Sequence, residues 1–423
     1  MKKLAIAVFA MSCCAQLALA AVDFDNGNFD LKNEISDLAL KVPAPAVKPA
    51  GAQKDWTIMV FVNGKNNLEQ FALKDMNEME QVGSSDKVNI VTEVGRMNGY
   101  DTSDGDWKTV RRYLVKKDAD PSHIASPVVQ ELQSVDMGDY HSVIDFADWA
   151  KANYPAKHYM LIIWNHGAGW IKGLPPATKG ISYDEVTNHH IDTPQLGQVL
   201  KQIGGVDVYG SDACLMQMAE VDYELKDYAQ YIVGSEETEP GDGYTYNTFL
   251  GPLVANPAMT PEQVARQAVD AYADHYQTTG DGSTQSFLKT SDLPGFLNVT
   301  DAFASAIMKA GDKAAATTAM NSAQKYAYPE NKDLYDFARL VVANTKNADV
   351  KAKGQALMDY IKNTLIRENR TTDSSGGWYG PTSYANSNGI AVYLPGKAAP
   401  STYAALQWAK ASNWDDFIAY MAK

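Results

Sequence analysis

Apolar runs of strand length alternate with helical patterns from residue 56 to residue 234. The runs are rich in β-branched and aromatic residues, which is typical of strands buried on both faces of a parallel sheet. The segments between them repeat apolar residues at three- and four-residue steps, which indicates amphipathic helices. The predicted strands are residues 56–62, 88–94, 107–116, 158–164, 206–209 and 231–234, and the predicted helices are 67–82, 142–153, 193–203 and 215–228. This alternation predicts an α/β fold in which helices cover both faces of a mostly parallel sheet, with ligands bound beyond the carboxyl ends of the strands.

The chain after residue 260 is richer in helical patterns than the part before it. The predicted helices there are residues 261–276, 295–310, 333–342, 352–367 and 403–421, and the predicted strands are 285–289 and 389–394. We therefore expect a core over residues 55–260 and a helix-rich part over residues 261–423. This second part either flanks the same domain or forms a small domain of its own.

The first twenty residues have the pattern of an export signal. Two lysines at 2–3 precede the apolar run Leu4–Met11, and Ala18-Leu19-Ala20 is a cleavage site of the small-x-small type. An alternative is lipid attachment at Cys13 or Cys14. Such sites usually have a leucine three residues before the cysteine, but Cys13 has Ala10 at that position. We expect simple cleavage, and a protein that is exported to the periplasm or the extracellular space.

Residues 21–54 are predicted to form a loosely ordered arm or propeptide, because the stretch 43–51 is rich in proline and alanine. The chain is 45% apolar and 21% charged, as expected for a globular protein. Its net charge of −14 argues against nucleic acid and anionic membranes as partners. Apart from the leader, no apolar run approaches the roughly 20 residues of a membrane span.

Cys214 is the one cysteine that remains after the leader is removed. It follows the predicted strand 206–209, and His166 follows the predicted strand 158–164. The carboxyl ends of parallel strands lie at one edge of a sheet, and the two residues are 48 positions apart (166 to 214) with one predicted helix between them. A single right-handed crossover therefore makes their strands neighbours or near-neighbours.

A thiol and an imidazole at one sheet edge fit nucleophilic catalysis. The imidazole can take the thiol proton and later protonate a leaving amine. A helix predicted to begin after Cys214 would also favour the thiolate. The backbone N–H groups of Gly167 and Cys214 are candidate donors to an oxyanion, because glycine allows a close approach.

The simpler interpretations are a core cysteine and a turn histidine. Their occurrence at successive strand ends favours catalysis. One Cys and one His are too few ligands for a metal site, and the sequence contains no C-x-x-C or H-E-x-x-H motif.

Four segments together resemble the clostripain family of cysteine peptidases. They are WTIMVFVNGKNNLE, NHGAGW, DACLMQMAEV and VGSEETEPGDGYTY, and the resemblance extends over about residues 55–423. It implies a caspase-like fold and a peptidase that cleaves protein or peptide substrates after Arg or Lys. It also implies that His166 and Cys214 form the catalytic dyad.

The resemblance further implies an anionic substrate pocket. Asp212, two positions before Cys214, would pair with the basic side chain of the substrate. Asp242, in Pro240-Gly-Asp-Gly-Tyr244, is a second candidate. The structural alternatives are a helix N-cap for Asp212 and a turn residue for Asp242.

Members of the family are often cleaved between the His and the Cys. The polar segment 171–188 contains Lys172 and Lys179 as predicted processing sites. Some members depend on calcium, and Asp101, Asp104 and Asp106, or Glu236, Glu237 and Glu239, are candidate ligands, although turn and surface roles are simpler. No cofactor is required by the sequence, and His189-His190 is predicted to be a loop pair without a role.

The sequence thus predicts an exported cysteine endopeptidase that cleaves after Arg or Lys and processes itself between His166 and Cys214. One alternative is a catalytically silent binding or surface protein on the same scaffold. Another is a peptide ligase that uses the same dyad. The oligomeric state is left open.

Overall fold

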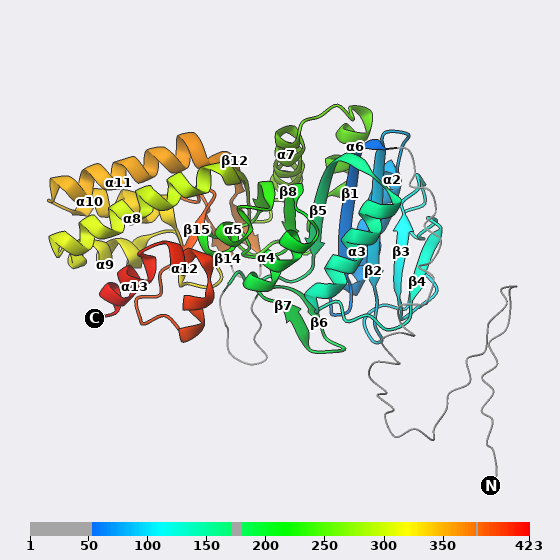
Figure 1. Ribbon diagram of the computed structural model, residues 1–423, viewed down its shortest axis with the longest axis horizontal. Helices are drawn as coiled ribbons and strands as arrows, with labels where there is room; N and C mark the ends of the chain where they lie inside the picture. Colours follow the sequence, from blue (N-terminus) through cyan, green and yellow to red (C-terminus); the bar gives the residue numbers. More distant parts are fainter. Residues whose placement is uncertain (1–52, 171–179, 378–379) are drawn as a thin grey trace, which may run out of the picture. The chain divides into compact units, whose positions relative to one another are not determined.

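The centre of the fold is a mixed β-sheet (Figure 1). The computed structural model describes residues 53–170, 180–377 and 380–423, and within them nine strands form this sheet. The strands are β1 (Lys54–Asn63), β2 (Val88–Gly95), β3 (Val110–Leu114), β4 (Val128–Leu132), β5 (Ala156–Trp164), β8 (Val206–Asp212), β9 (Ala229–Gly234), β10 (Ser283–Lys289) and β12 (Ile366–Thr372). Their order is β12-β10-β9-β8-β5-β1-β2-β3-β4. The central run from β9 to β2 is parallel, whereas β10, β12, β3 and β4 pair antiparallel at the two edges.

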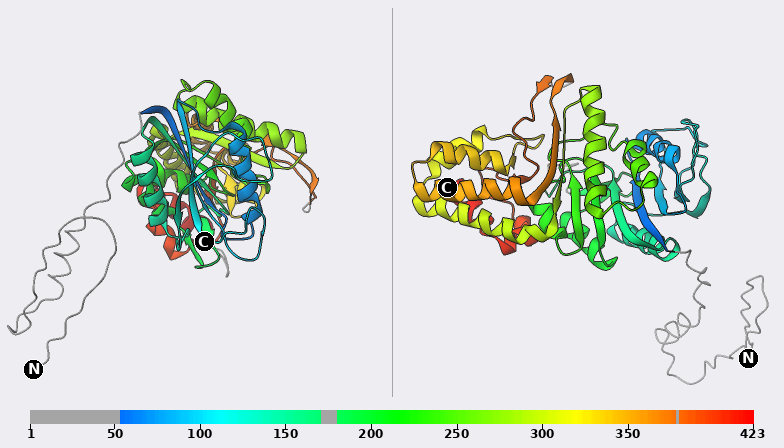
Figure 2. Two further views of the ribbon diagram at one scale, coloured as in Figure 1. Left: turned by 90° about the vertical axis from the view of Figure 1, so that its right-hand side faces the viewer. Right: turned by 90° about the horizontal axis from the view of Figure 1, so that it is seen from above.

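Helices cover both faces of this sheet, as Figure 2 shows. One face carries α2 (Glu69–Val82), α6 (Tyr246–Ala255) and α7 (Pro261–Thr279), and the other carries α3 (Tyr140–Asn153), α4 (Thr193–Gln202) and α5 (Ala219–Leu225). Strand β1 contributes to both layers because its side chains alternate. Ile58 and Val60 pack with the α2 layer, and Met59 and Phe61 pack with the α3 layer. The predicted α/β fold with a helix-covered, mostly parallel sheet is confirmed.

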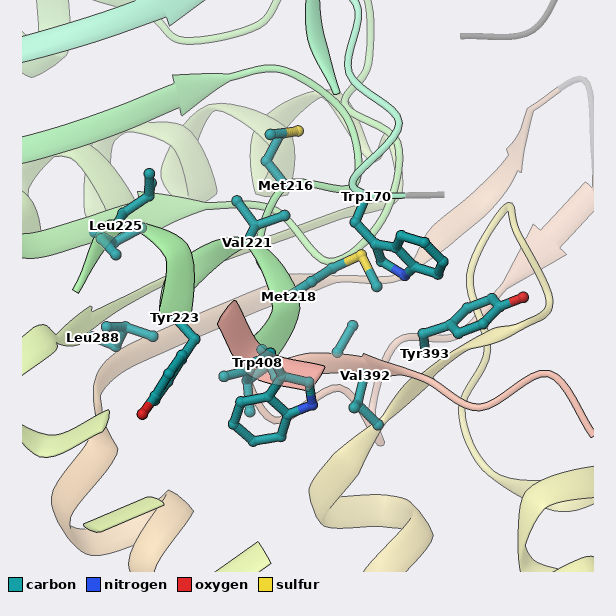
Figure 3. Packing of buried hydrophobic residues seen from close by; sticks show 14 of the residues in the cluster. Trp170, Met216, Met218, Val221, Tyr223, Leu225, Leu288, Val392, Tyr393 and Trp408 are labelled. Atoms are coloured by element: carbon teal, nitrogen blue, oxygen red, sulfur yellow. The ribbon is translucent and has the colours of Figure 1, made fainter. Parts of the chain in front are cut away.

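The part after residue 260 continues this sheet and adds a helical layer. Its remaining elements are α8 (Leu293–Ala310), α9 (Lys313–Ser322), β11 (Asn331–Asp333), α10 (Leu334–Asn344), α11 (Ala348–Tyr360), β13 (Ser374–Gly377), β14 (Gly380–Thr382), β15 (Ala391–Tyr393), α12 (Gln407–Ala411) and α13 (Trp414–Ala422). Trp408 and Tyr393 from this part belong to the same buried cluster as Met218 and Val221 at the start of α5 (Figure 3). The chain from Ala50 to Lys423 accordingly forms one compact unit.

Several elements differ from the prediction where partners distant in sequence decide the backbone. His189 and His190 are not in a loop but in β7 (His189–Ile191), which pairs with β6 (Ile181–Asp184). The predicted helix 352–367 ends earlier, because residues from Ile366 onward pair with β10 as strand β12. The predicted helix 403–421 is broken at Ser412 into α12 and α13. Elements β4, α6 and α9 were not predicted.

Helix α4 begins as the sequence predicts. Asp192 caps it by accepting a hydrogen bond from the backbone N–H of Gln195, whose side chain bonds back to the N–H of Asp192. This helix lies between β5 and β8 in the chain, and therefore forms the crossover that makes those two strands neighbours.

No helix among the described residues is long and apolar enough to cross a membrane. The predicted signal peptide, the predicted arm up to residue 52, and the predicted processing residues Lys172 and Lys179 lie outside the described residues.

Candidate active site

Strands β5 and β8 are direct neighbours in the parallel sheet, as the crossover argument predicts. Their last paired residues are Trp164 and Asp212. His166 and Cys214 each follow two positions later, so both lie just beyond the same sheet edge. The backbone N–H of Asn165 donates to the carbonyl oxygen of Asp212 over 3.1 Å, which continues the pairing past the strand ends.

Gly167 packs directly against the backbone of Cys214. A Cβ atom at this position would clash with the Cys214 carbonyl oxygen and would lie 3.0 Å from the Cys214 nitrogen. Only glycine leaves room for this approach. The segment after His166 and the turn that carries Cys214 therefore form one packed unit.

The turn after Cys214 is not the start of a helix, so the predicted helix N-terminus beside the thiol is wrong. Leu215 adopts a positive φ of 64°, which turns the chain sharply. The N–H groups of Leu215 and Gln217 donate to the carbonyl oxygens of Glu237 and Ser235 after β9 (3.0 and 2.9 Å). Helix α5 begins only at Ala219. A helix-terminus field fades within about one turn, so it does not stabilise a Cys214 thiolate.

The Cys214 thiol is half-buried and faces backbone donors. The N–H of Glu239 donates to Sγ over 3.3 Å, and the N–H of Gly167 also points to the sulfur. Burial, followed by the nearby Glu239 carboxylate, nevertheless raises the pKa of the thiol to about 12. Cys214 is therefore a neutral thiol at neutral pH.

The His166 imidazole is also neutral at neutral pH. Burial holds its pKa below the ordinary value of 6.5, although the Glu185 carboxylate acts in the opposite direction. Its Nε2 lies 2.7 Å from Oδ1 of Asn67, and the edge of its ring faces Tyr183 at a centroid distance of 6.4 Å. A neutral thiol and a neutral imidazole suit proton transfer during attack rather than a preformed ion pair.

Asp212 is buried at the end of β8, and is not a helix N-cap. Its Oδ1 accepts the N–H of Tyr244 (3.1 Å), and its Oδ2 accepts the hydroxyl of Tyr246 (2.8 Å). Burial raises the pKa of this carboxyl to about 6. Its hydrogen bonds come from neutral donors, so a cation that reached this carboxylate would gain a charge-assisted interaction.

Further carboxyl groups surround Asp212. Asp75 on α2 accepts the Trp164 indole N–H over 2.6 Å, and its other oxygen is buried and has no hydrogen-bond partner among the described residues. Both carboxyl oxygens of Glu239 are buried beside Asp212, and within the described part of the chain neither has a hydrogen bond of normal geometry. Burial raises the pKa of Asp75 and of Glu239, and the charge of Asp212 raises both further.

Asp242 lies on the segment that covers Asp212. The next residue, Gly243, has a φ of 56°, and a Cβ there would lie 2.7 Å from Oδ1 of Asp212. The Asp242 side chain is 40% exposed and pairs with Lys74 (2.7 Å) and His275 (3.4 Å). Burial would raise the pKa of Asp242, but these two partners outweigh burial and lower the pKa. The structure thus brings the two predicted pocket acids onto adjoining segments, with Asp242 already paired to a lysine.

A model of the clostripain family matches residues 60–421. The chain belongs to the clostripain family. The match confirms the predicted resemblance, and places this protein in a family of cysteine proteases.

Known relatives agree with this assignment. Clostripain of Hathewaya histolytica is 28% identical over 221 residues, which cover 47% of this chain and 42% of that protein. The match thus spans less than half the length of that relative. A secreted C11 cysteine protease of Bacteroides thetaiotaomicron, solved with an irreversible peptide inhibitor, has a TM-score of 0.66 at 21% identity and covers 86% of this chain and 100% of its own. An inactive zymogen C11 protease of Parabacteroides distasonis has a TM-score of 0.65 at 20% identity, over 85% of this chain and 98% of its own. These two structures show that the fold is shared.

Five of the six predicted calcium ligands of this clostripain-family protein, all except Glu239, have a partner within the described part of the protein. Asp101 pairs with Arg96, Asp104 accepts the N–H of Ile124, and Asp106 pairs with Lys108. Glu236 accepts the N–H of Gly389, and Glu237 accepts that of Ala327. In the part of the chain that the structure describes, no three His, Cys, Asp or Glu side chains are arranged to hold a metal ion. These residues therefore do not fit a calcium site, and calcium dependence stays a prediction from the resemblance.

The described residues on either side of the segment with Lys172 and Lys179 lie beside the His166 loop. Gly169 and Gly180, which flank it, form a backbone hydrogen bond of 2.8 Å, and Ala168 donates to Gly180 over 2.9 Å. The two lysines themselves lie outside the described residues.

Sequence reasoning missed Asn67, Asp75 and Lys74 in the clostripain-family site. All three belong to the segment that follows β1, and Asn67 even lies in a segment quoted for the resemblance. No local pattern marks them, because their partners His166, Trp164 and Asp242 are about 90 to 170 residues away in the chain.

Proposed function

We propose that this protein is an exported cysteine endopeptidase that cleaves after Arg or Lys, with Cys214 as nucleophile and His166 as general base and acid. The observation that carries this proposal is the position of the half-buried Cys214 thiol: its backbone packs against Gly167 of the His166 loop, and the N–H of Glu239 donates to its sulfur. A silent binding protein would have no need to keep an imidazole and a thiol at adjoining strand ends.

The reaction follows from these groups. The proton of the Cys214 thiol passes to His166 while Sγ attacks the carbonyl carbon of the scissile peptide. The N–H groups of Gly167 and Cys214 are the candidate donors to the resulting oxyanion, and one such donor is typically worth about 3 kcal/mol. His166 returns the proton to the amine nitrogen as the C–N bond breaks. A water molecule then gives a proton to His166, attacks the thioester and releases the acid, and the proton returns to Sγ.

The carboxyl groups near the nucleophile support a preference for basic side chains. The carboxyl groups of Asp212 and Glu239 are buried next to the Cys214 turn. Asp242 lies on the same segment as Glu239, three residues later, and is partly exposed. Arginine can form paired, charge-assisted hydrogen bonds with a carboxylate there, which favours it over lysine and strongly over leucine.

Self-processing at Lys172 or Lys179 follows from the same specificity. Both lysines belong to the segment that begins next to the His166 loop, and a cleavage after either one fits a protease selective for basic residues. Export rests on the leader pattern at residues 1–20, and a relative with this fold is a secreted protease.

Activity on matched peptides tests the proposal. The purified protein, cleaved after its leader, is assayed on peptides that differ only in Arg, Lys, Asp or Leu before the scissile bond, with Cys214→Ala as control. We expect cleavage of the Arg and Lys peptides only, and none by the variant. Cleavage after Asp or Leu at a comparable kcat/KM would contradict the specificity, and no cleavage by the wild type in any peptide would favour a silent binding protein. Adding a free amine and analysing the products distinguishes ligation from hydrolysis.

A further inference from the structure

A side-chain hydrogen bond joins His166 to the turn before helix α2. Oδ1 of Asn67 lies 2.7 Å from Nε2 of His166. An amide oxygen only accepts hydrogen bonds, so this contact is a hydrogen bond when the imidazole nitrogen carries the proton. A neutral imidazole carries one proton, which leaves Nδ1 with the free lone pair.

The turn that carries Asn67 is fixed by neighbouring asparagines. Asn66 is fully buried, donates to the carbonyl oxygen of Tyr183 (2.7 Å) and accepts the N–H of Leu68 (2.9 Å). Asn63 donates to the hydroxyl of Ser182 over 3.1 Å. The Asn67 side chain therefore projects from a backbone held on both sides of it.

Strand β6, which contains Ser182 and Tyr183, also fixes the residue before His166. Asn165 accepts the N–H of Tyr183 over 2.7 Å and donates to the carbonyl oxygen of Asn63. Strand β6 thus anchors both the Asn67 turn and the His166 loop. This shared anchor holds the Asn67 turn and the His166 loop next to each other.

We propose that Asn67 is a positioning residue for catalysis: it holds His166 as the Nε2–H tautomer, with Nδ1 free to take the proton of Cys214. The proposal rests on the proposed function of the His166–Cys214 pair. Beyond that function, the tautomer of His166 is selected by a residue of another segment, the turn between β1 and α2. The Glu185 carboxylate is the charged group that acts on His166, and it does not replace the amide contact.

We expect the fold to tolerate the replacement of Asn67. Its side chain is exposed, whereas Asn63 and Asn66 are buried. Truncating an exposed side chain usually has little effect on stability. Asn153, an exposed asparagine at the end of α3 whose side chain donates to the carbonyl oxygen of Trp149 in the same helix, provides the matched control.

The kinetic test compares Asn67→Ala, Asn67→Asp and Asn153→Ala. We expect Asn67→Ala to lower kcat/KM by roughly 10- to 100-fold through kcat, since general acid–base catalysis contributes about 10²–10⁴. The aspartate also accepts from Nε2–H, so Asn67→Asp should recover most of this loss at pH 8. Its charge favours the imidazolium, so the acid limb of its pH profile should move to higher pH. Asn153→Ala should behave as the wild type. Wild-type kcat for Asn67→Ala would overturn the proposal.

A second measurement does not depend on activity. Imidazole ¹⁵N spectra of the Cys214→Ala protein report which ring nitrogen carries the proton, and His166→Gln in the same background identifies the signal. We expect Nε2–H to dominate, and the preference to be lost in Asn67→Ala. A dominant Nδ1–H form with Asn67 present would overturn the proposal. Peptide cleavage by the Cys214→Ala protein would instead contradict the proposed dyad. The spectra test the tautomer of His166 separately, so the two failures can be distinguished.

Discussion

Trp164 and Asp212 are the last paired residues of two adjacent parallel strands, and His166 and Cys214 follow them by the same number of positions. The register of one strand pair therefore places the imidazole and the thiol at the same height beyond the sheet. Gly167 then permits the two loops to touch, since a side chain there would collide with the Cys214 backbone. The arrangement depends on sheet geometry that no single loop residue controls.

Removing either member of the pair should abolish peptidase activity and leave the fold intact. Cys214→Ala and His166→Ala should each lower kcat/KM by at least about 10⁴-fold. Both side chains are only half-buried at the sheet edge, so Tm should change by no more than about 4 °C. Kinetics on an Arg peptide together with calorimetry check this. Wild-type turnover by the Cys214→Ala protein would disprove the assignment of the nucleophile.

The free thiol should react slowly with small electrophiles at neutral pH. Burial raises the pKa of Cys214 to about 12, so the thiolate fraction should rise about tenfold for each pH unit between pH 7 and 9. Cys214 is the single cysteine after residue 14, so alkylation by iodoacetamide can be followed by mass spectrometry without other reactive thiols. A rate that is constant from pH 5 to 8 would indicate a preformed thiolate–imidazolium pair instead.

Asp212→Asn should raise the stability of the protein at pH 8 and weaken its preference for Arg peptides. The folded pKa of Asp212 is about 6, above the ordinary value of 3.8, so the native state binds the proton more tightly than the unfolded state. Its favourable contribution is present below about pH 4 and is lost as the pH rises through 6. Asparagine has no charge to desolvate, and the Tyr246 hydroxyl can accept from its amide. The free energy of unfolding of the variant should therefore exceed that of the wild type by up to roughly 2–3 kcal/mol at pH 8. This difference should vanish near pH 4.

The same variant should lose most of its preference for Arg over Leu peptides, because the cluster then lacks its central carboxylate. Urea unfolding at both pH values and kcat/KM for both peptides provide the measurements. A variant that is less stable at pH 8, or one that keeps the full Arg preference, would show that Asp212 has only a structural role.

Lys74 should compete with the substrate for Asp242. It pairs with Asp242 over 2.7 Å, and both side chains are partly exposed, so the pair is worth about 1 kcal/mol. Lys74→Met leaves Asp242 with His275 only, so KM for Arg peptides should fall about fivefold with kcat unchanged. Lys157→Met, which breaks an ion pair with Asp55 of the same length near the start of β1, is the matched control. An unchanged KM for Lys74→Met would place Asp242 outside the substrate pocket.

Maturation should depend on the protein's own thiol. Wild type is expected to appear as two fragments cut after Lys172 or Lys179, and Cys214→Ala as one chain, under identical expression. Lys172→Ala combined with Lys179→Ala should remain intact while keeping its thiol. N-terminal sequencing of the fragments identifies the cut. Equal cleavage of wild type and Cys214→Ala would mean that another protease makes the cut.

The sequence alone predicted which groups meet at the sheet edge. The strand-length apolar runs before His166 and Cys214, and the single crossover between them, require neighbouring parallel strands and therefore a shared edge. Gly167 could also be predicted to allow close contact, because a residue without a side chain lets the backbone after the histidine approach a neighbouring segment. Both inferences depend on periodicity and chain direction, which a linear sequence records directly.

Tertiary structure decided the chemical state of these groups. The helix expected after Cys214 does not begin there, because the turn bonds to the segment after β9 instead, and burial keeps both the thiol and the imidazole neutral. The partners Asn67 for His166, Asp75 beside Asp212 and Lys74 for Asp242 all come from the segment after β1. Burial and hydrogen bonding depend on which surfaces pack together, and contacts across about a hundred residues leave no local pattern in the sequence from which to predict them.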